Sequence, residues 1–420
     1  MAQAAKKTLL PAIIGPGILV AATGVGAGDL ATAAFAGSKL GVLILWAVIV
    51  GAFVKFVLNE GLTRWQLATG ETLLEGAMSR LGRPAQYIFL VYLVVWTFMV
   101  AAALMSACGV AAQALLPIAD DPATGKITFG IILSIVGVVM VRAGGYRLFE
   151  KVMGLCIGIM FVTVVLTAIL LRPDLGSIAS GLLWPSIPDV GGAGLAWTIA
   201  LIGGVGGTVT VLCYGYWIRE EGRLSEDDLG SCRLDLGVAY VMTAIFGVAM
   251  VIIGSTIEVE GKGAGLIVKL ADSLGGELGV AGKWIFLVGA FGAIFSSLLG
   301  VWQSVPYLFA DLWRMIAGGE AGGSTGNAGP ASLSKTAPYR WYLYGMASLP
   351  MLGLWVGFAR MQKLYAIVGA LFLPMLALVL LLLNGRSAWV GERYRNHPVT
   401  SIFLVAILLF FAMAGWMKLR

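Results

Sequence analysis

The sequence has few charged residues, only 12% Asp, Glu, Lys and Arg against 59% hydrophobic residues. Soluble domains carry about 25% charged residues, so this scarcity excludes an ordinary soluble enzyme. The mean hydropathy is +0.92, and apolar runs long enough to cross a bilayer as helices recur along the chain. The composition therefore predicts an integral membrane protein with many spans, located in the inner (plasma) membrane if its source is bacterial.

Histidine is nearly absent, and the cysteines show no pairing. The single histidine, His397, falls in a predicted cytoplasmic loop, which excludes a histidine proton relay inside the membrane. The four cysteines, Cys108, Cys156, Cys213 and Cys232, indicate neither a disulfide framework nor a zinc site. The sequence also lacks a nucleophile elbow, a phosphate loop and a paired His/Glu hydrolase motif. We therefore expect no enzymatic activity and no cofactor.

Apolar runs separated by charged or Pro/Gly-rich segments predict eleven membrane spans. They are residues 11–37, 42–60, 86–116, 127–142, 147–171, 194–217, 235–256, 282–310, 341–358, 364–384 and 399–417. With the N-terminus in the cytoplasm, more Lys and Arg residues fall inside than outside, which follows the positive-inside rule and places the C-terminus outside. We interpret the net charge of +6 as this excess. The expected partners are the lipid bilayer and a small ion or solute, and no nucleic acid.

The first span has an unusual centre, the segment Gly24-Val25-Gly26-Ala27-Gly28-Asp29. Asp29 is the only ionisable side chain between residues 9 and 38. Each glycine costs about 1 kcal/mol relative to alanine in a helix, so we expect this segment to be unwound. Unwound backbone inside a membrane must line a cavity or be buried in protein, and an acid there is a functional-site candidate by default. We expect substrate contacts from Gly26, Gly28 and Asp29.

The sixth span contains a second glycine cluster, Gly203-Gly204-Val205-Gly206-Gly207. Glycine-interrupted spans at matching positions of two inverted halves indicate the binding site of a secondary transporter. A competing interpretation is that small residues merely allow helices to pack closely. The substrate-binding residues expected in this span are Gly206, Gly207, Thr208, Thr210 and Tyr214.

The two glycine clusters also predict the organisation of the chain. Five spans separate them, and an odd number of spans per unit inverts the second unit relative to the first. We therefore expect a single transmembrane domain over residues 1–420, with inverted repeats at about 11–171 and 194–384 and an extra helix at about 399–417.

Two charged positions in the second span have alternative interpretations. Lys55 could extend its long side chain to the membrane surface, or pair with Asp29 or Glu60. Glu60 and Arg64 are four residues apart on one helix face, which predicts a local ion pair at the inner boundary.

Three segments stand out: Gly15-Pro16-Gly17-Ile18-Leu19-Val20-Ala21 and Ala36-Gly37-Ser38-Lys39-Leu40-Gly41 in and after the first span, and Tyr146-Arg147-Leu148-Phe149-Glu150-Lys151 later. They resemble the Nramp family of divalent-metal transporters. The resemblance covers most of the chain. It implies an all-α membrane protein with a LeuT-like fold, in which two inverted five-helix repeats are followed by an extra helix.

The functional residues depart from the family pattern. The family's Asp-Pro-Gly-Asn is replaced by Gly26-Ala27-Gly28-Asp29, and its Met-Pro-His is absent from the sixth span. No residue between 86 and 118 is charged, and Leu371-Phe372-Leu373-Pro374 stands where we expect the family's tenth-span glutamine. Without a methionine sulfur, one carboxylate with carbonyl and hydroxyl oxygens suits a hard, largely hydrated ion such as Mg²⁺.

These observations predict a secondary transporter or facilitator for a divalent cation. Asp29 would be the one charged metal ligand, and alternating access would occur around the unwound first and sixth spans. A bound Mg²⁺ or Mn²⁺ would be the substrate. An alternative keeps the fold but replaces the metal with a small cationic or zwitterionic organic solute.

Overall fold

The computed structural model describes residues 15–143, 146–190, 193–257, 266–318 and 330–419. Within these ranges the chain is helical and contains no β-strand. The Gly- and Ser-rich segment at 319–329 and the N-terminal residues 1–14 lie outside the described residues.

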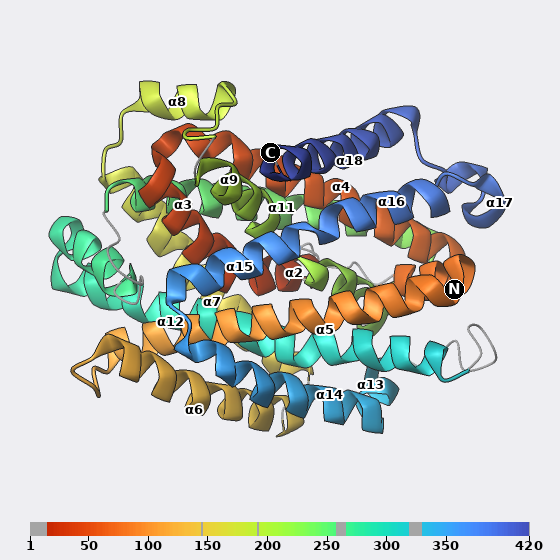
Figure 1. Cartoon of the computed structure of the whole chain (residues 1–420), viewed down its shortest axis with the longest axis horizontal. Helices are drawn as coiled ribbons and strands as arrows, with labels where there is room; N and C mark the ends of the chain where they lie inside the picture. Colours follow the sequence, from red (N-terminus) through yellow and green to blue (C-terminus); the bar gives the residue numbers. More distant parts are fainter. Residues whose placement is uncertain (1–14, 144–145, 191–192, 258–265, 319–329, 420) are drawn as a thin grey trace, which may run out of the picture.

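The helices form one bundle (Figure 1). Its first half contains α2 (Pro16–Gly24), η1 (Val25–Thr32), α3 (Ala33–Leu40), η2 (Gly41–Ile44), α4 (Leu45–Thr69), α5 (Leu73–Leu115), α6 (Pro122–Ala143), α7 (Tyr146–Leu170) and α8 (Leu175–Leu183). The middle contains α9 (Gly194–Gly204), η3 (Val209–Cys213), α10 (Tyr214–Glu220), η4 (Glu226–Asp228), α11 (Leu229–Ser255) and α12 (Leu266–Ile316). The last part contains α13 (Pro330–Leu333), α14 (Ala337–Ser348), η5 (Leu349–Trp355), α15 (Phe358–Ala370), α16 (Phe372–Leu383), α17 (Ser387–Val390), η6 (Glu392–Tyr394) and α18 (Pro398–Leu419).

Each of the eleven predicted spans falls on helical segments, although their boundaries differ. Among the described residues, eight helices are long and apolar enough to cross a membrane, or nine if α7 and α8, bent by 119°, count as one span. The smaller number arises because the first two predicted spans share one continuous helical stretch, Asp29–Thr69. The ninth predicted span is divided between α14 and the 3₁₀ turn η5, so neither part reaches spanning length.

The two glycine-rich spans lie inside the bundle. Helix α5 packs along α12 and α6, while α11 packs against α3 and α4. Helix α9 packs against α15 and α4. In the apolar stretch that runs through α9 and α10, 89% of the residues are buried inside the protein, whereas in α18 the share is 17%. The sixth span is therefore enclosed by protein, as irregular backbone at membrane depth requires.

The first span is not unwound, so this prediction is wrong. Residues Val25–Thr32 form a π-helical segment between α2 and α3, and the helix continues through the glycines. A π-helix has wider turns, with i→i+5 hydrogen bonds, and is frequent at functional sites. The glycines are accommodated by this widening and not by a loss of helical structure.

The sixth span is broken at its glycine cluster, as predicted. Helix α9 ends at Gly204, and Val205 is extended with φ −62° and ψ 127°. Gly206 and Gly207 follow with φ of 74° and 84°. Residues without a side chain are favoured in this left-handed region. The chain becomes helical again in the 3₁₀ turn η3 and then in α10.

The loop between the fifth and sixth spans forms a short helix at one end of the bundle, opposite α13 and α17 (Figure 1). Asp174 caps α8 by accepting the N–H groups of Gly176 and Ser177. Leu175 and Trp184 are each 77% exposed. Trp is enriched where a membrane meets water, so exposed apolar side chains such as these suit a position at the membrane surface.

Candidate functional site

Asp29 contacts the break of the sixth span directly. Its side chain is fully buried, and its Oδ1 accepts the N–H of Gly206 at 2.7 Å. Its other oxygen, Oδ2, is buried without a hydrogen-bond partner. An unpartnered buried carboxylate oxygen is costly, and such groups are found where a ligand, ion or water binds.

Lys55 reaches the same break from α4. The side chain is fully buried, so it does not extend to the membrane surface. Its ammonium donates to the carbonyl oxygen of Gly203 at 2.7 Å and also to that of Val205. Lys55 and Asp29 meet the same break from two sides, but among the described residues they do not approach within ion-pairing distance of each other. The second span thus supplies a cation to the end of α9.

Glu60 is not the partner of Lys55. It accepts instead from Arg64 at 3.3 Å, which confirms the predicted local pair, and from Arg233 of α11 at 2.7 Å.

The first and sixth spans approach each other closely around this site. A methyl group added at Gly24 would lie 2.5 Å from the backbone nitrogen of Gly207, so the contact requires glycine. Next to it, the hydroxyl of Thr23 donates to that of Thr210 at 3.3 Å. Gly26 and Gly28 lie in the π-helical segment that carries Asp29.

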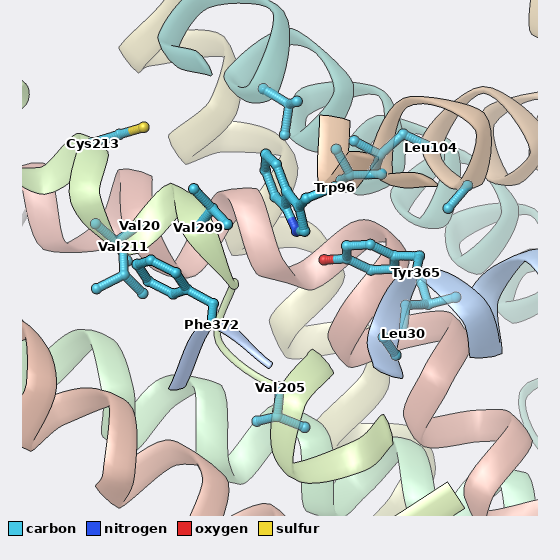
Figure 2. Packing of buried hydrophobic residues seen from close by; sticks show 14 of the residues in the cluster. Val20, Leu30, Trp96, Leu104, Val205, Val209, Val211, Cys213, Tyr365 and Phe372 are labelled. Atoms are coloured by element: carbon cyan, nitrogen blue, oxygen red, sulfur yellow. The ribbon is translucent and has the colours of Figure 1, made fainter. Parts of the chain in front are cut away.

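Thr208 faces a group of aromatic side chains on the other side of the break. Its Oγ1 accepts the indole N–H of Trp96 in α5 at 2.9 Å. Figure 2 shows Trp96 and Tyr365, from α15, beside the chain that leads from Val205 to Val209. Of the residues predicted in this span, Gly206 therefore contacts Asp29, Gly207 and Thr210 lie against Gly24 and Thr23 of the first span, and Thr208 lies against buried aromatic rings.

Tyr214 binds a second buried acid. Its hydroxyl donates to Oδ2 of Asp235 in α11 at 3.0 Å. The same oxygen accepts the N–H of Gly17 at 2.9 Å and Arg223 at 3.2 Å. This cluster connects the start of the first span to α10 and α11, and the hydroxyl expected to contact substrate is already hydrogen-bonded there.

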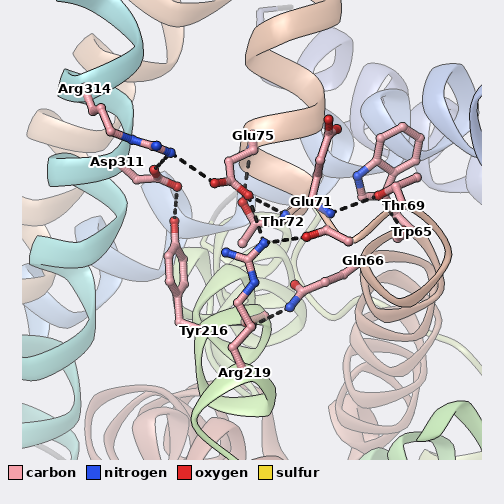
Figure 3. A network of polar contacts seen from close by, with 12 residues as sticks. Trp65, Gln66, Thr69, Glu71, Thr72, Glu75, Tyr216, Arg219, Asp311 and Arg314 are labelled. Carbon is pink, nitrogen blue, oxygen red and sulfur yellow. Dashed lines mark hydrogen bonds and ion pairs between the residues drawn. The ribbon is translucent and has the colours of Figure 1, made fainter. Parts of the chain in front are cut away.

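A larger polar network lies where α10 meets the start of α5 (Figure 3). Glu75 forms ion pairs with Arg219 of α10 at 3.0 Å and with Arg314 of α12 at 3.1 Å. Arg314 also pairs with Asp311, which accepts the hydroxyl of Tyr216 at 2.8 Å. Three helices are joined at this end of the bundle by charged groups that are mostly shielded from water.

Sequence reasoning missed a buried glutamine that joins α15 to α5. Gln362 lies in α15, which begins six residues before the predicted start of the tenth span. The side chain is fully buried, donates to the carbonyl of Ala103 at 2.9 Å, and leaves its Oε1 without a partner. An earlier boundary for the tenth span would have revealed it, because Gln362 is a polar residue next to a long apolar run.

The site offers hard donors and no preformed cluster of charged ligands. Within the described ranges, no three His, Cys, Asp or Glu side chains are grouped as a metal site requires. The available donors are the free oxygen of Asp29, threonine hydroxyls and backbone carbonyls. Oxygen ligands of this kind suit hard cations or the polar groups of organic molecules.

Solved structures define the fold. A mutant of the Eremococcus coleocola manganese transporter matches all of this chain and 88% of its own, with a TM-score of 0.74 at 16% identity. The structure of MhsT in complex with L-phenylalanine matches 96% of this chain and 97% of its own, with a TM-score of 0.59 at 15% identity. The protein thus has an all-α, LeuT-like membrane-protein fold.

The sequence comparison defines the family. The family described as "Natural resistance-associated macrophage protein-like", Nramp, matches residues 17–419. The divalent metal cation transporter MntH of Aeromonas hydrophila is 23% identical over 421 residues, covering 95% of this chain and 94% of that protein. The chain belongs to the Nramp family, which confirms the resemblance seen in the sequence; members of this family are transporters and not enzymes.

Proposed function

We propose that this protein is a secondary transporter that moves a divalent cation by alternating access, with the ion held at Asp29 between the first and sixth spans. The observation that carries the proposal is the buried, unpartnered Oδ2 of Asp29 at the break of the sixth span. Relatives over most of the chain are named divalent metal cation transporters, which supports the choice of substrate.

The ion in this proposal is a hard one that keeps much of its water. Only one oxygen of Asp29 is free, and the last carbonyls of α9 already accept Lys55. Mg²⁺ gives up its water reluctantly and is commonly bound through one or two carboxylates, so it fits this donor set better than a soft transition metal. The ion is substrate, and the proposal includes no resident cofactor. The N-terminus is in the cytoplasm and the C-terminus outside, following the distribution of Lys and Arg.

A second candidate is a small zwitterionic or cationic organic solute. It is favoured by Lys55, whose ammonium faces the same break as Asp29, so that the two buried side chains together carry no net charge. A divalent ion added there would leave positive charge without compensation in a medium of low dielectric constant, which is costly. A zwitterion would keep the site neutral, and its ammonium group could bind the free oxygen of Asp29.

Uptake into proteoliposomes tests the first candidate against the second. We expect the wild-type protein to take up Mg²⁺ or Mn²⁺ and Asp29→Ala to lose this activity by at least about tenfold, since the hydrogen bonds and charge of a carboxylate are worth about 1.5–3 kcal/mol. The matched control is Asp272→Asn, which removes an exposed carboxylate that pairs with Lys283. It should leave uptake unchanged.

Absence of uptake for every divalent ion would contradict the proposal. The second candidate would then be examined by thermal melting of the same preparation with amino acids and small amines. A ligand that binds only the folded protein raises its melting temperature as the ligand concentration passes the dissociation constant.

A further inference from the structure

The end of α9 has the properties of a cation site. The last carbonyl groups of a helix have no partner within the helix, and the helix dipole places partial negative charge there. In this chain the helix ends inside the bundle at Gly204, and the next residues turn away through two glycines with positive φ. The carbonyls of Gly203 and Val205 are therefore directed at a common point. The next residue, Gly206, donates its N–H to the carboxylate of Asp29 at 2.7 Å.

The side chain of Lys55 occupies this point. Its ammonium donates to both carbonyls, and none of the side chain is exposed. A lysine ammonium is a compact point charge with three donors, and so it can replace a small bound cation among oxygen ligands. Two of its three donors are used by these carbonyls, and its charge acts on Asp29.

We propose that Lys55 is a tethered cation: it fills the cation site formed by the carbonyls at the end of α9, excludes free metal ions from the carbonyls of Gly203 and Val205, and thereby restricts the substrate to the free side of Asp29. The occupancy of the site by Lys55 stands without the proposed transport function. Only its effect on substrate choice rests on that function.

The proposal has a direct consequence for alkali cations. The wild-type chain binds no Na⁺ at this place, because a cation is already covalently present. Removing the lysine side chain creates a vacancy lined by the carbonyl oxygens of Gly203 and Val205, with the carboxylate of Asp29 beside the same break. Carbonyl oxygens are ligands that Na⁺ and small ammonium ions accept. The variant therefore acquires a binding site that the wild-type protein does not have.

The test is thermal melting of the purified full-length protein in NaCl, in methylammonium chloride and in choline chloride at equal ionic strength. For Lys55→Ala we expect the melting temperature to rise by several degrees with Na⁺ or methylammonium and to keep rising with concentration. The bulky choline ion should have no such effect. The wild-type protein should melt at the same temperature in all three salts.

The matched control is Lys126→Ala. Lys126 in α6 is a second buried lysine that donates to a backbone carbonyl, that of Val356, at 2.8 Å. Its removal should lower stability without creating a response to Na⁺ or methylammonium. A rise of equal size in this variant would show that the response is general to buried lysines and would overturn the proposal.

Two further results would also overturn it. If Lys55→Ala is destabilised but indifferent to both cations, Lys55 is a structural contact only. If the wild-type protein itself is stabilised by Na⁺ as strongly as the variant, the site is not filled by the lysine. Should Lys55→Ala fail to fold, Lys55→Gln is tested in the same salts, because its amide group keeps a donor but carries no charge. The wild-type measurement does not depend on either variant.

Melting reports on the site whether or not a divalent ion is transported. Loss of divalent uptake in the proteoliposome assay, combined with a Na⁺ response of Lys55→Ala, would refute the proposed substrate and leave the tethered cation intact. Normal divalent uptake by the wild-type protein, combined with a Lys55→Ala variant whose melting temperature does not respond to Na⁺, would refute the tethered cation and leave the proposed substrate intact.

Discussion

Asp29 and Asp235 are two buried acids that differ in how the protein satisfies them. Each accepts a backbone N–H from a neighbouring span, Asp29 from Gly206 and Asp235 from Gly17. Each also leaves one oxygen without a partner. Asp235 is in direct ion pairing with Arg223 at 3.2 Å and accepts the hydroxyl of Tyr214, whereas Asp29 has no cation within ion-pairing distance in the described part of the chain.

The difference separates a structural acid from one that is available to a ligand. Removing one partner of a buried ion pair leaves an uncompensated charge, so a pair such as Asp235 with Arg223 is important for the stability of the fold. A buried carboxylate with a single hydrogen-bond donor and no direct counter-charge is stabilised more by a bound substrate ion than by its contacts within the protein. This difference supports the proposal that Asp29 binds the substrate, whereas Asp235 holds the first span against α11.

The largest effect should appear when the charge is removed from each acid in turn. Asp29→Asn keeps an acceptor for the N–H of Gly206 but loses the negative charge, and we expect divalent uptake per folded molecule to fall about a hundredfold, or about 2.7 kcal/mol. Asp235→Asn should retain measurable uptake. Proteoliposome uptake checks both, and equal losses in the two variants would remove the distinction drawn between them.

For the stability of the fold, we expect substitution of Asp235 to have a larger effect than substitution of Asp29. Asp235→Ala leaves Arg223 without its acid and removes three hydrogen bonds to Oδ2, so we expect a loss of about 3 kcal/mol. Asp29→Asn should cost less. Melting of both variants in the same detergent measures the difference. A larger loss for Asp29→Asn would mean that Asp29 is the more structural of the two acids.

The backbone at the break provides a smaller effect. Gly207 has φ of 84°, so Gly207→Ala is expected to cost about 1–2 kcal/mol of stability. The matched control is Gly158→Ala in α7, where an added methyl group meets no atom within 4 Å. That change should be neutral or stabilise the helix by up to about 1 kcal/mol. Thermal melting compares the two, and tolerance at Gly207 equal to that at Gly158 would contradict the observed backbone.

The smallest effect concerns Tyr214. Tyr214→Phe removes one of the three donors to Asp235, and we expect a loss of about 1 kcal/mol in stability. The half-saturation concentration for uptake should not change, because the hydroxyl is bound to Asp235. A shift in half-saturation without a loss of stability would support the prediction from sequence that Tyr214 contacts substrate.

The sequence was sufficient for the membrane class, the fold and the break of the sixth span. Apolar runs and their punctuation depend on local composition, and four glycines around Val205 cannot be held in a helix without cost. The same argument failed for the first span. There Val25–Thr32 remains helical because its glycines are taken up by π-helical turns, whose geometry no composition rule distinguishes from a break.

The site could be predicted only for residues that share a span with the glycines. We could predict Asp29, Gly206 and Thr208 because they lie in or next to the glycine clusters in the sequence. Lys55 and Gln362 could not be predicted in this way, because they lie in other helices. Their positions depend on how α4 and α15 pack against α9, which is a property of the whole bundle. The predicted inverted repeats and the orientation of the termini stay predictions.

The ion pairs around Glu75 bear on the rate at which the proposed transporter would open at this end of the bundle. Arg219 and Arg314 reach Glu75 from α10 and α12, and Glu75 is only 14% exposed, so dissolved salt screens these pairs weakly. Any movement that opens this end of the bundle between α5 and α10 has to separate them before water can replace them. In the described part of the chain, Glu75 and Asp29 share no hydrogen-bond or ion-pair partner. Under the proposed alternating access, we therefore expect a protein with Glu75 neutralised to transport faster at an unchanged half-saturation concentration.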